Sequence, residues 1–158
     1  MNRTAMNITI PYQITTGQAS DAEAIAQFQI DMALESEGTV LDRDTITCGV
    51  KAALEDPAKG LYLIARDQER PIGSLMLTRE WSDWHNQWYW WIQSVYVAPD
   101  YRQKGVYRAM YAHIKAMARR SGIAQIRLYV DKTNTRAQQV YQQLGMEETH
   151  YLMYEEAL

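Results

Sequence analysis

Residues 95–107 read VYVAPDYRQKGVY, and this stretch decides the fold. It begins as the end of an apolar strand, passes through a turn, and continues into apolar residues at helical spacing. The first N–H groups of a helix have no partner within the helix, so a junction of strand, turn and helix presents them to an anion. Gly105 lets the backbone approach such an anion, and Arg102 and Lys104 add positive charge beside it. The segment therefore predicts a turn that can bind a pyrophosphate.

The remaining apolar patterns predict alternating strands and helices on both sides of this turn. Strands are expected at 12–15, 61–65, 72–78, 89–97, 126–130 and 151–154, and helices from Ser20 or Asp21, at 42–54, between Pro99 and Ser121, and at 134–144. The second and third of these strands form a hairpin, and the fourth and fifth are parallel neighbours joined through a helix. A polar loop is expected at 80–87.

This order of elements predicts an α+β fold whose central sheet is mixed but mostly antiparallel, with helices on its flanks. A βαβ crossover over 89–130 carries the anion-binding turn. We expect one domain over residues 1–158, with 1–10 as a loosely ordered N-terminal extension.

The composition disfavours several classes of protein. The net charge is −3, whereas binding to a nucleic-acid backbone needs clustered Lys and Arg, so no nucleic-acid partner is expected. No apolar run approaches the roughly 18 residues of a membrane span, so no membrane association is expected. Cys48 is the only cysteine, which excludes an intramolecular disulfide and favours a reducing, cytoplasmic setting. No metal site is predicted.

A second motif lies near the end of the chain. Residues 134–141 read NTRAQQVY, and residues 144–146 read LGM. Together with the turn at 102–107, this sequence resembles the GCN5-related N-acetyltransferase (GNAT) family, whose pyrophosphate turn is Arg/Gln-x-x-Gly-x-Gly/Ala and whose later helix carries Asn-x-x-Ala-x-x-x-Tyr. The order of elements matches the family over 12–154, with the specific motifs in about the last 65 residues. The resemblance implies a GNAT-like fold that binds acetyl-CoA and transfers its acetyl group to an amine.

The resemblance also implies a role for each matching residue. Backbone amides over 103–108 would hold the pyrophosphate, and Val95 and Val97 would offer backbone groups to the pantetheine arm. Asn134 would contact the cofactor as well. The implied cofactor site comprises Val95, Tyr96, Val97, Arg102, Gln103, Lys104, Gly105, Val106, Tyr107, Arg108, Asn134 and Tyr141.

Two tyrosines in this set, Tyr107 and Tyr141, have large side chains with different expected roles. Tyr107 stands where the family usually has Gly or Ala, so we expect its side chain to turn away from the anion-binding face. The resemblance implies that Tyr141 lies near the thioester sulfur. A phenol with a pKa near 10 stays protonated at neutral pH and can donate a proton to a departing thiolate.

An alkylammonium must lose a proton before its nitrogen attacks a thioester, yet the strand at 89–97 contains no carboxylate. Glu80, expected beside that strand, is the first candidate for the catalytic base. The other candidates are Asp83, His85, Glu35, Glu37 and an ordered water.

All five tryptophans lie between residues 81 and 91. Trp90 and Trp91 face opposite sides of a sheet, because successive side chains in a strand alternate. An aromatic wall beside a carboxylate would suit a cation, each cation–π contact contributing about 0.5–2 kcal/mol. The expected acceptor site comprises Glu35, Trp81, Trp84, Trp91 and Gln93, and the acceptor is a small amine, a lysine or an N-terminal amine.

Several interpretations of the activity stay open. Direct transfer in a ternary complex is favoured because Cys48 lies far along the chain from the motifs and has no evident activating partner. The alternative is an inactive acyl-CoA-binding module that regulates or binds a partner, supported by the missing strand carboxylate and by Tyr107. Asn134 and Tyr141 favour the enzyme. Acylation of a protein or a tRNA is a third option, and the resemblance implies a possible homodimer.

Overall fold

The computed structural model describes residues 12–158. The extension expected at 1–10 lies outside the described residues. The chain divides into two compact units, one ending at Leu128 and the other spanning Tyr129–Leu158, and each is described by itself. The expectation of a single domain stays a prediction. None of the helices within residues 12–158 is long and apolar enough to cross a membrane.

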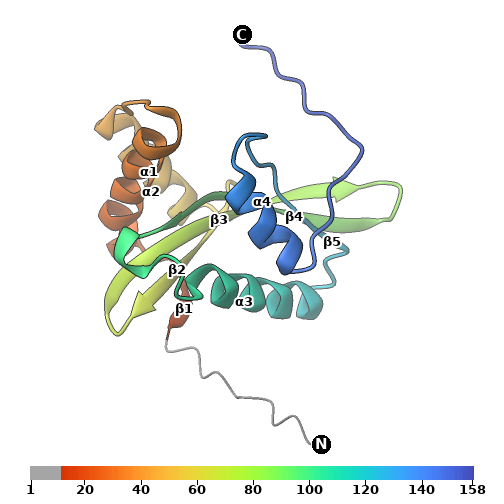
Figure 1. The fold of residues 1–158 in the computed structure, drawn as a ribbon, viewed down its shortest axis with the longest axis horizontal. Helices are drawn as coiled ribbons and strands as arrows, with labels where there is room; N and C mark the ends of the chain where they lie inside the picture. Colours follow the sequence, from red (N-terminus) through yellow and green to blue (C-terminus); the bar gives the residue numbers. More distant parts are fainter. Residues whose placement is uncertain (1–11) are drawn as a thin grey trace, which may run out of the picture. The chain divides into compact units, whose positions relative to one another are not determined.

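The first unit contains a five-stranded sheet with the order β1-β2-β3-β4-β5 (Figure 1). The strands are β1 (Gln13–Thr16), β2 (Leu61–Asp67), β3 (Arg70–Ser82), β4 (Gln87–Val97) and β5 (Gln125–Arg127). The first four strands pair antiparallel in succession, and β4 pairs with β5 in parallel. The predicted α+β class, the mostly antiparallel sheet and the parallel crossover are therefore confirmed.

Among residues 12–158, three α-helices belong to the first unit and one to the second. They are α1 (Ala22–Glu37), α2 (Arg43–Glu55) and α3 (Val106–Arg120), followed by α4 (Thr135–Gln143), and two short 3-10 helices are η1 (Ala19–Asp21) and η2 (Pro99–Tyr101). The helix predicted at 42–54 is confirmed with its N-cap, because Asp42 Oδ1 accepts the Thr45 backbone N–H at 2.8 Å. Asp21 precedes α1 but makes no side-chain cap bond to it.

Both faces of the sheet are buried by helices. On one face, Ile25 of α1 and Val50 of α2 form a cluster with Tyr62 and Ile64 of β2. Alternation along β2 turns Leu63 to the other face, where it is fully buried. Since α3 contacts β1, β2 and β4, it covers that second face with its apolar stripe of Val106, Met110, Ile114 and Ala118.

The prediction of a polar loop at 80–87 was wrong, because most of this segment is the end of a long hairpin. Strand β3 continues to Ser82 and β4 begins at Gln87, with Glu80 opposite Tyr89 and Trp81 opposite Trp88. Cross-strand aromatic pairs stabilise such ladders, so the tryptophans extend the strands into the polar segment. Only a tight turn remains, and Asn86 adopts a left-handed φ of 50° in it.

Two strand predictions near the end of the chain also need correction. Strand β5 ends at Arg127 instead of continuing to residue 130, because its ladder with β4 stops there. The strand expected at 151–154 is absent from the described second unit. Its side chains are 65% to 87% exposed, and a strand requires a ladder partner that this unit does not supply.

One buried ion pair ties the start of α1 to the sheet. Arg66 Nη2 of β2 contacts Asp21 Oδ1 at 2.7 Å, and their side chains are only 16% and 5% exposed. The second oxygen of Asp21 accepts the Gln18 backbone N–H at 2.8 Å. Removing one partner of a buried pair leaves the other charge without compensation, which is strongly destabilising.

We expect the Asp21→Asn substitution to lower the free energy of unfolding by roughly 3 kcal/mol, because Arg66 would stay buried without its counter-ion. The matched control is Lys59→Gln, which removes an exposed pair with Asp56 and should cost far less stability, because water screens the two charges. Denaturant unfolding measures both. Equal losses in the two variants would contradict the stabilising role of the buried pair.

Candidate functional site

The candidate site begins at a β-bulge in the central strand β4. Met76 of β3 pairs with Gln93 and Ser74 pairs with Tyr96, so one residue of β3 stands opposite two residues of β4. Ser94 is one of these two and has a left-handed φ of 54°. A residue with a side chain in this conformation costs about 1–3 kcal/mol, and such strained positions cluster at functional sites.

A buried glutamine of α1 reaches this bulge. Gln29 is 4% exposed, and its Nε2 donates to the Ser94 backbone oxygen at 3.5 Å, the long limit of a hydrogen bond. The amide satisfies a carbonyl that the bulge turns out of the ladder. Gln29 was not predicted from the sequence, although a polar residue four positions after the buried Ile25 was a detectable signal.

Strand β4 parts from β5 just before the bulge. The parallel ladder joins Tyr89, Trp90 and Trp91 to residues 125–127, and within residues 12–158 no further pair follows. The β5-side edge of β4 therefore has no strand partner from Ile92 to Val97 in the described part of the chain. Unpaired strand edges can pair with an extended ligand, which suits the proposed contacts of Val95 and Val97.

The predicted anion-binding turn follows β4 directly. Gln103 and Gly105 have left-handed φ angles of 62° and 82°, and the first helical bond of α3 runs from Ala109 N–H to the Gly105 oxygen at 3.0 Å. A Cβ on Gly105 would meet nothing within 4 Å, so the turn is open at this position. A helix of this length with an open glycine at its N-cap can accept an anion.

Arg102 stabilises the turn through contacts within the protein. Its Nε donates to the Val97 oxygen at 2.8 Å, its Nη2 donates to Glu35 Oε2 at 2.6 Å, and its guanidinium lies 5.4 Å from the centre of the Tyr96 ring. Its backbone N–H donates to Pro99 at 3.2 Å. Arg102 thus fastens the turn to the ends of β4 and α1.

Glu35 joins the same network. It accepts the Tyr96 hydroxyl at 3.2 Å in addition to its ion pair with Arg102. Burial and the negative charge of Glu35 raise the pKa of the Tyr96 phenol. The structure therefore brings Glu35 to the turn, and its bonds there are with Arg102 and Tyr96, whereas the sequence analysis expected it beside the tryptophans.

The two other large side chains of the turn lie against aromatic rings. The Lys104 Nζ is 5.8 Å from the centre of the Tyr101 ring. Tyr107 stacks on Tyr111, one helical turn later in α3, with ring centres 6.2 Å apart and an interplanar angle of 21°. The ring of Tyr107 is thus held along the helix, which agrees with the expectation that it turns away from the turn.

The second unit contains the two remaining predicted site residues, Asn134 and Tyr141, at and in α4. Asn134 caps this helix, because its Oδ1 accepts the Ala137 backbone N–H at 3.1 Å. Tyr141 is half-buried in the same helix, and this burial raises the pKa of its phenol. The phenol therefore keeps its proton over a wider pH range than a free tyrosine does.

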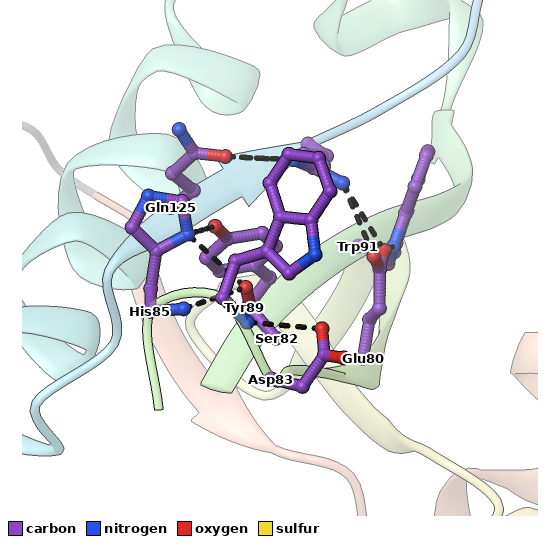
Figure 2. A network of polar contacts seen from close by, with 9 residues as sticks. Glu80, Ser82, Asp83, His85, Tyr89, Trp91 and Gln125 are labelled. Carbon is purple, nitrogen blue, oxygen red and sulfur yellow. Dashed lines mark hydrogen bonds and ion pairs between the residues drawn. The ribbon is translucent and has the colours of Figure 1, made fainter. Parts of the chain in front are cut away.

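A polar cluster of Glu80, Trp91 and Arg127 spans strands β3, β4 and β5. Figure 2 labels Glu80 and Trp91 of this cluster. Glu80 Oε2 accepts the Trp91 indole N–H at 2.5 Å, and Arg127 Nη1 lies 3.2 Å and 3.4 Å from the two Glu80 oxygens. The Glu80 and Arg127 side chains are 40% and 32% exposed. The expectation that Glu80 lies beside the central strand is confirmed by its pairing with Tyr89.

A second set of contacts lies next to this cluster, around His85 in the hairpin turn. His85 Nδ1 is 2.5 Å from the Tyr89 hydroxyl and 3.1 Å from Ser82 Oγ, as Figure 2 shows. Tyr89 is 3% exposed, whereas His85 is exposed. Asp83 bonds locally instead, accepting the Trp84 backbone N–H at 2.9 Å.

The structure does not bring all the predicted acceptor residues together. Gln93 and Trp91 share one face of β4, and Gln93 Nε2 donates to Thr78 Oγ1 at 2.7 Å. Trp81 lies on the opposite face, where its ring meets that of Trp88 at a centre distance of 5.1 Å. Trp84, at the hairpin turn, is 87% exposed. A small hollow on the face of Trp81 is lined by Arg79, Trp88, Trp90, Ser121 and Ile123.

Arg127 is the second residue that the sequence analysis missed. The apolar pattern around it indicated a strand, and the charge within that pattern was the available signal. A charged residue in a short strand needs a partner, and here the partner is Glu80 on β3.

The family comparison gives a match over most of the chain. The model of the acetyltransferase (GNAT) family matches residues 22–146. A comparison with curated proteins finds no match.

Solved structures of the same fold include close and distant relatives. The chain is 40% identical to a possible acetyltransferase from Clostridium difficile 630, over 93% of this chain and 97% of that one, with a TM-score of 0.87. It is 21% identical to an integron cassette protein from the mobile metagenome of Cole Harbour Salt Marsh, over 92% and 90%, with a TM-score of 0.81. It is 18% identical to AAC(6')-Iy in complex with the bisubstrate analog CoA-S-monomethyl-acetylneamine, over 93% and 98%, with a TM-score of 0.74.

The sheet with its parallel crossover and these likenesses define an acetyltransferase fold. The chain belongs to the acetyltransferase (GNAT) family, and this membership supports acyl transfer as its class of reaction.

We expect Gly105→Ala to lower the free energy of unfolding by about 1–2 kcal/mol, because alanine disfavours the φ of 82° that the turn requires. Gly49→Ala is the matched control. Gly49 lies inside α2, a methyl group there would meet nothing within 4 Å, and the substitution should add roughly 0.5–1 kcal/mol of stability. Thermal or denaturant unfolding measures both changes. A Gly105 variant as stable as the parent would show that the turn tolerates a side chain without strain.

Proposed function

We propose that the protein transfers an acetyl group from acetyl-CoA to an amine, directly and within a ternary complex. The observation that supports this proposal most is that three structural features follow one another along β4 and into α3. A strained bulge at Ser94, an unpaired strand edge and an open turn at Gly105 follow one another in the first unit. This arrangement suits a long ligand with an extended arm and an anionic end.

The residues that would hold acetyl-CoA fit its two chemical parts. The edge of β4 at Val95 and Val97 suits the amide-containing arm, although the Val97 oxygen already accepts from Arg102. Backbone amides over 103–108, at the N-terminus of α3, suit the pyrophosphate. Arg102 supports the turn, and its side chain is already bonded within the protein. When bound, acetyl-CoA supplies an activated acetyl thioester.

The reaction forms an N–C bond and breaks the thioester C–S bond. An ammonium loses two protons on this path, one to a base before the nitrogen attacks and one as the amide forms, and the leaving sulfur gains one. Tyr141 is our candidate for the group that donates to the sulfur, because its raised pKa keeps the phenol protonated. Glu80 is our candidate for the base that binds the ammonium and takes its first proton. Within residues 12–158, its Oε1 accepts only from Arg127 and therefore has a lone pair for one more donor.

The relatives support acetyl-CoA as the donor, but they support no particular acceptor. AAC(6')-Iy was solved with a bisubstrate analog that contains CoA, and the relative from Clostridium difficile 630 is described as a possible acetyltransferase. The acceptor of this chain is therefore proposed only as an amine. The alternative function is an acyl-CoA-binding module without catalysis, for which Glu80 in its ion pair with Arg127 is the favouring observation.

An acetyl-CoA assay over a panel of amines tests the proposed function. We expect release of free CoA that depends on one class of amine, with sequential kinetics and no lasting acetyl label on the protein. Cys48 is exposed on α2, and a Cys48→Ser variant should keep its turnover. Binding of CoA without transfer to any amine would support the inactive module, and a lasting label on Cys48 would exclude direct transfer.

We expect Tyr141→Phe to lower kcat by about 10²–10⁴-fold while the dissociation constant for CoA changes little, because only the proton donor is lost. Burial raises the pKa of Tyr141, so kcat in the parent should fall only at pH values above the ordinary tyrosine value of 10.0. Isothermal titration with CoA and a pH profile of kcat are the measurements. Tyr151→Phe, in the exposed tail, is the control and should change neither.

A further inference from the structure

We infer that the acceptor amine also carries a carboxylate, and that Arg127 binds this carboxylate. The inference rests on the proposed function, since it names the class of amine that the chain acetylates. Its basis is the cluster of Glu80, Trp91 and Arg127 on the face of the sheet that carries Gln93.

The aromatic rings of this cluster already hold a cation. The Arg127 guanidinium carbon lies 4.3 Å from the centre of the Tyr89 ring and 5.9 Å from that of Trp91. A guanidinium at these distances makes the cation–π contacts that a substrate cation would otherwise make. The cluster therefore favours a group that binds to Arg127 over a simple alkylammonium that binds to the rings.

The hydrogen bonds of Arg127 leave part of its guanidinium unused. Its Nε and Nη2 donate to Gln125 Oε1 at 3.2 Å and 3.0 Å, and its Nη1 donates to both Glu80 oxygens at 3.2 Å and 3.4 Å. A guanidinium has five N–H groups, so these four hydrogen bonds leave one N–H of Nη2 without an acceptor among residues 12–158. An N–H of a cationic guanidinium makes a charge-assisted hydrogen bond to a carboxylate oxygen.

Glu80 complements this arrangement with one acceptor. Its Oε2 accepts from both Trp91 and Arg127, whereas within the described part of the chain its Oε1 accepts from Arg127 alone. The cluster as a whole offers one charged donor and one acceptor to a ligand. A carboxylate and an ammonium carried by one molecule satisfy both, and a polyamine would leave the donor of Arg127 unused.

The position of the cluster also suits the acceptor. Arg127 pairs with Trp91 at the last rung of the β4–β5 ladder, and the bulge at Ser94 lies three residues farther along β4. That separation is about 10 Å along a strand. The cluster therefore adjoins the start of the unpaired edge of β4 at Ile92, and an amine near Glu80 would have its carboxylate directed to Arg127.

The test compares amines that differ only in the carboxylate. The pairs are glycine with ethylamine, β-alanine with propylamine, γ-aminobutyrate with butylamine, and ε-aminocaproate with hexylamine. We expect the amino acid to exceed its partner in kcat/KM by roughly 10- to 100-fold at one or more chain lengths, the range that charge-assisted hydrogen bonds provide.

Substitutions of Arg127 test whether this residue causes the preference for amines that carry a carboxylate. Arg127→Met leaves Glu80 without its ion pair, so the absolute rates change, but the ratio of kcat/KM within each pair should fall to about one. Arg127→Lys should restore only part of the preference because an ammonium lacks the planar guanidinium. Arg79→Met removes a positive charge from the opposite face of the same hairpin and should change no ratio. Circular dichroism and unfolding curves establish that each variant is folded.

A binding measurement keeps the inference testable without turnover. The Trp91 indole N–H donates to Glu80, so its proton resonance, assigned with Trp91→Phe, should shift when the amino acids are titrated into the CoA complex. The shift should be absent with the alkylamines and in Arg127→Met.

Transfer to alkylamines without a carboxylate preference, or a preference that survives in Arg127→Met, would overturn this inference alone. Absence of transfer to every amine would reject the proposed function, and the titration would then decide whether Arg127 binds a carboxylate.

Discussion

The bulge at Ser94 is the constraint on which the rest of the first unit depends. At this bulge two residues of β4 stand opposite one residue of β3, which changes the direction of the central strand. The bulge requires a strained, left-handed φ of 54° at Ser94. Gln29 stabilises the exposed carbonyl from α1. Because β4 bends here, its ladder with β5 ends at Trp91 and its edge leads directly into the turn before α3.

Charge in the site is arranged as two ion pairs that each cross between elements. Arg102 and Glu35 join the turn to α1, and Arg127 and Glu80 join β5 to β3 across the central strand. Pairs of this kind gain little stability when half-exposed, so their value lies in the geometry that they fix. One pair orients the turn where the donor is proposed to bind, and the other orients the indole of Trp91 where the acceptor is proposed to bind.

The sequence predicted those features that depend on local pattern. The turn with Gly105, the crossover and the α4 motif are all set by residues close in the chain, and the apolar periods indicated most elements. The hairpin end at Trp81 was missed because polar residues conceal a strand held by cross-strand aromatic pairs. The ion-pair partners of Glu80 and Glu35 were missed because each lies on another element, more than 40 residues away in the chain.

The short ladder of β5 has a consequence for the dynamics of the site. Three residue pairs hold this strand, and they close only after the whole crossover through α3 has formed, so the entropy lost in closing that loop is large for so short a ladder. Strand β5 is consequently the part of the sheet that costs least to release, and hydrogen exchange should be fastest on this edge. Its opening would separate Arg127 from Glu80, so the part of the sheet proposed to bind the acceptor assembles last and loosens first.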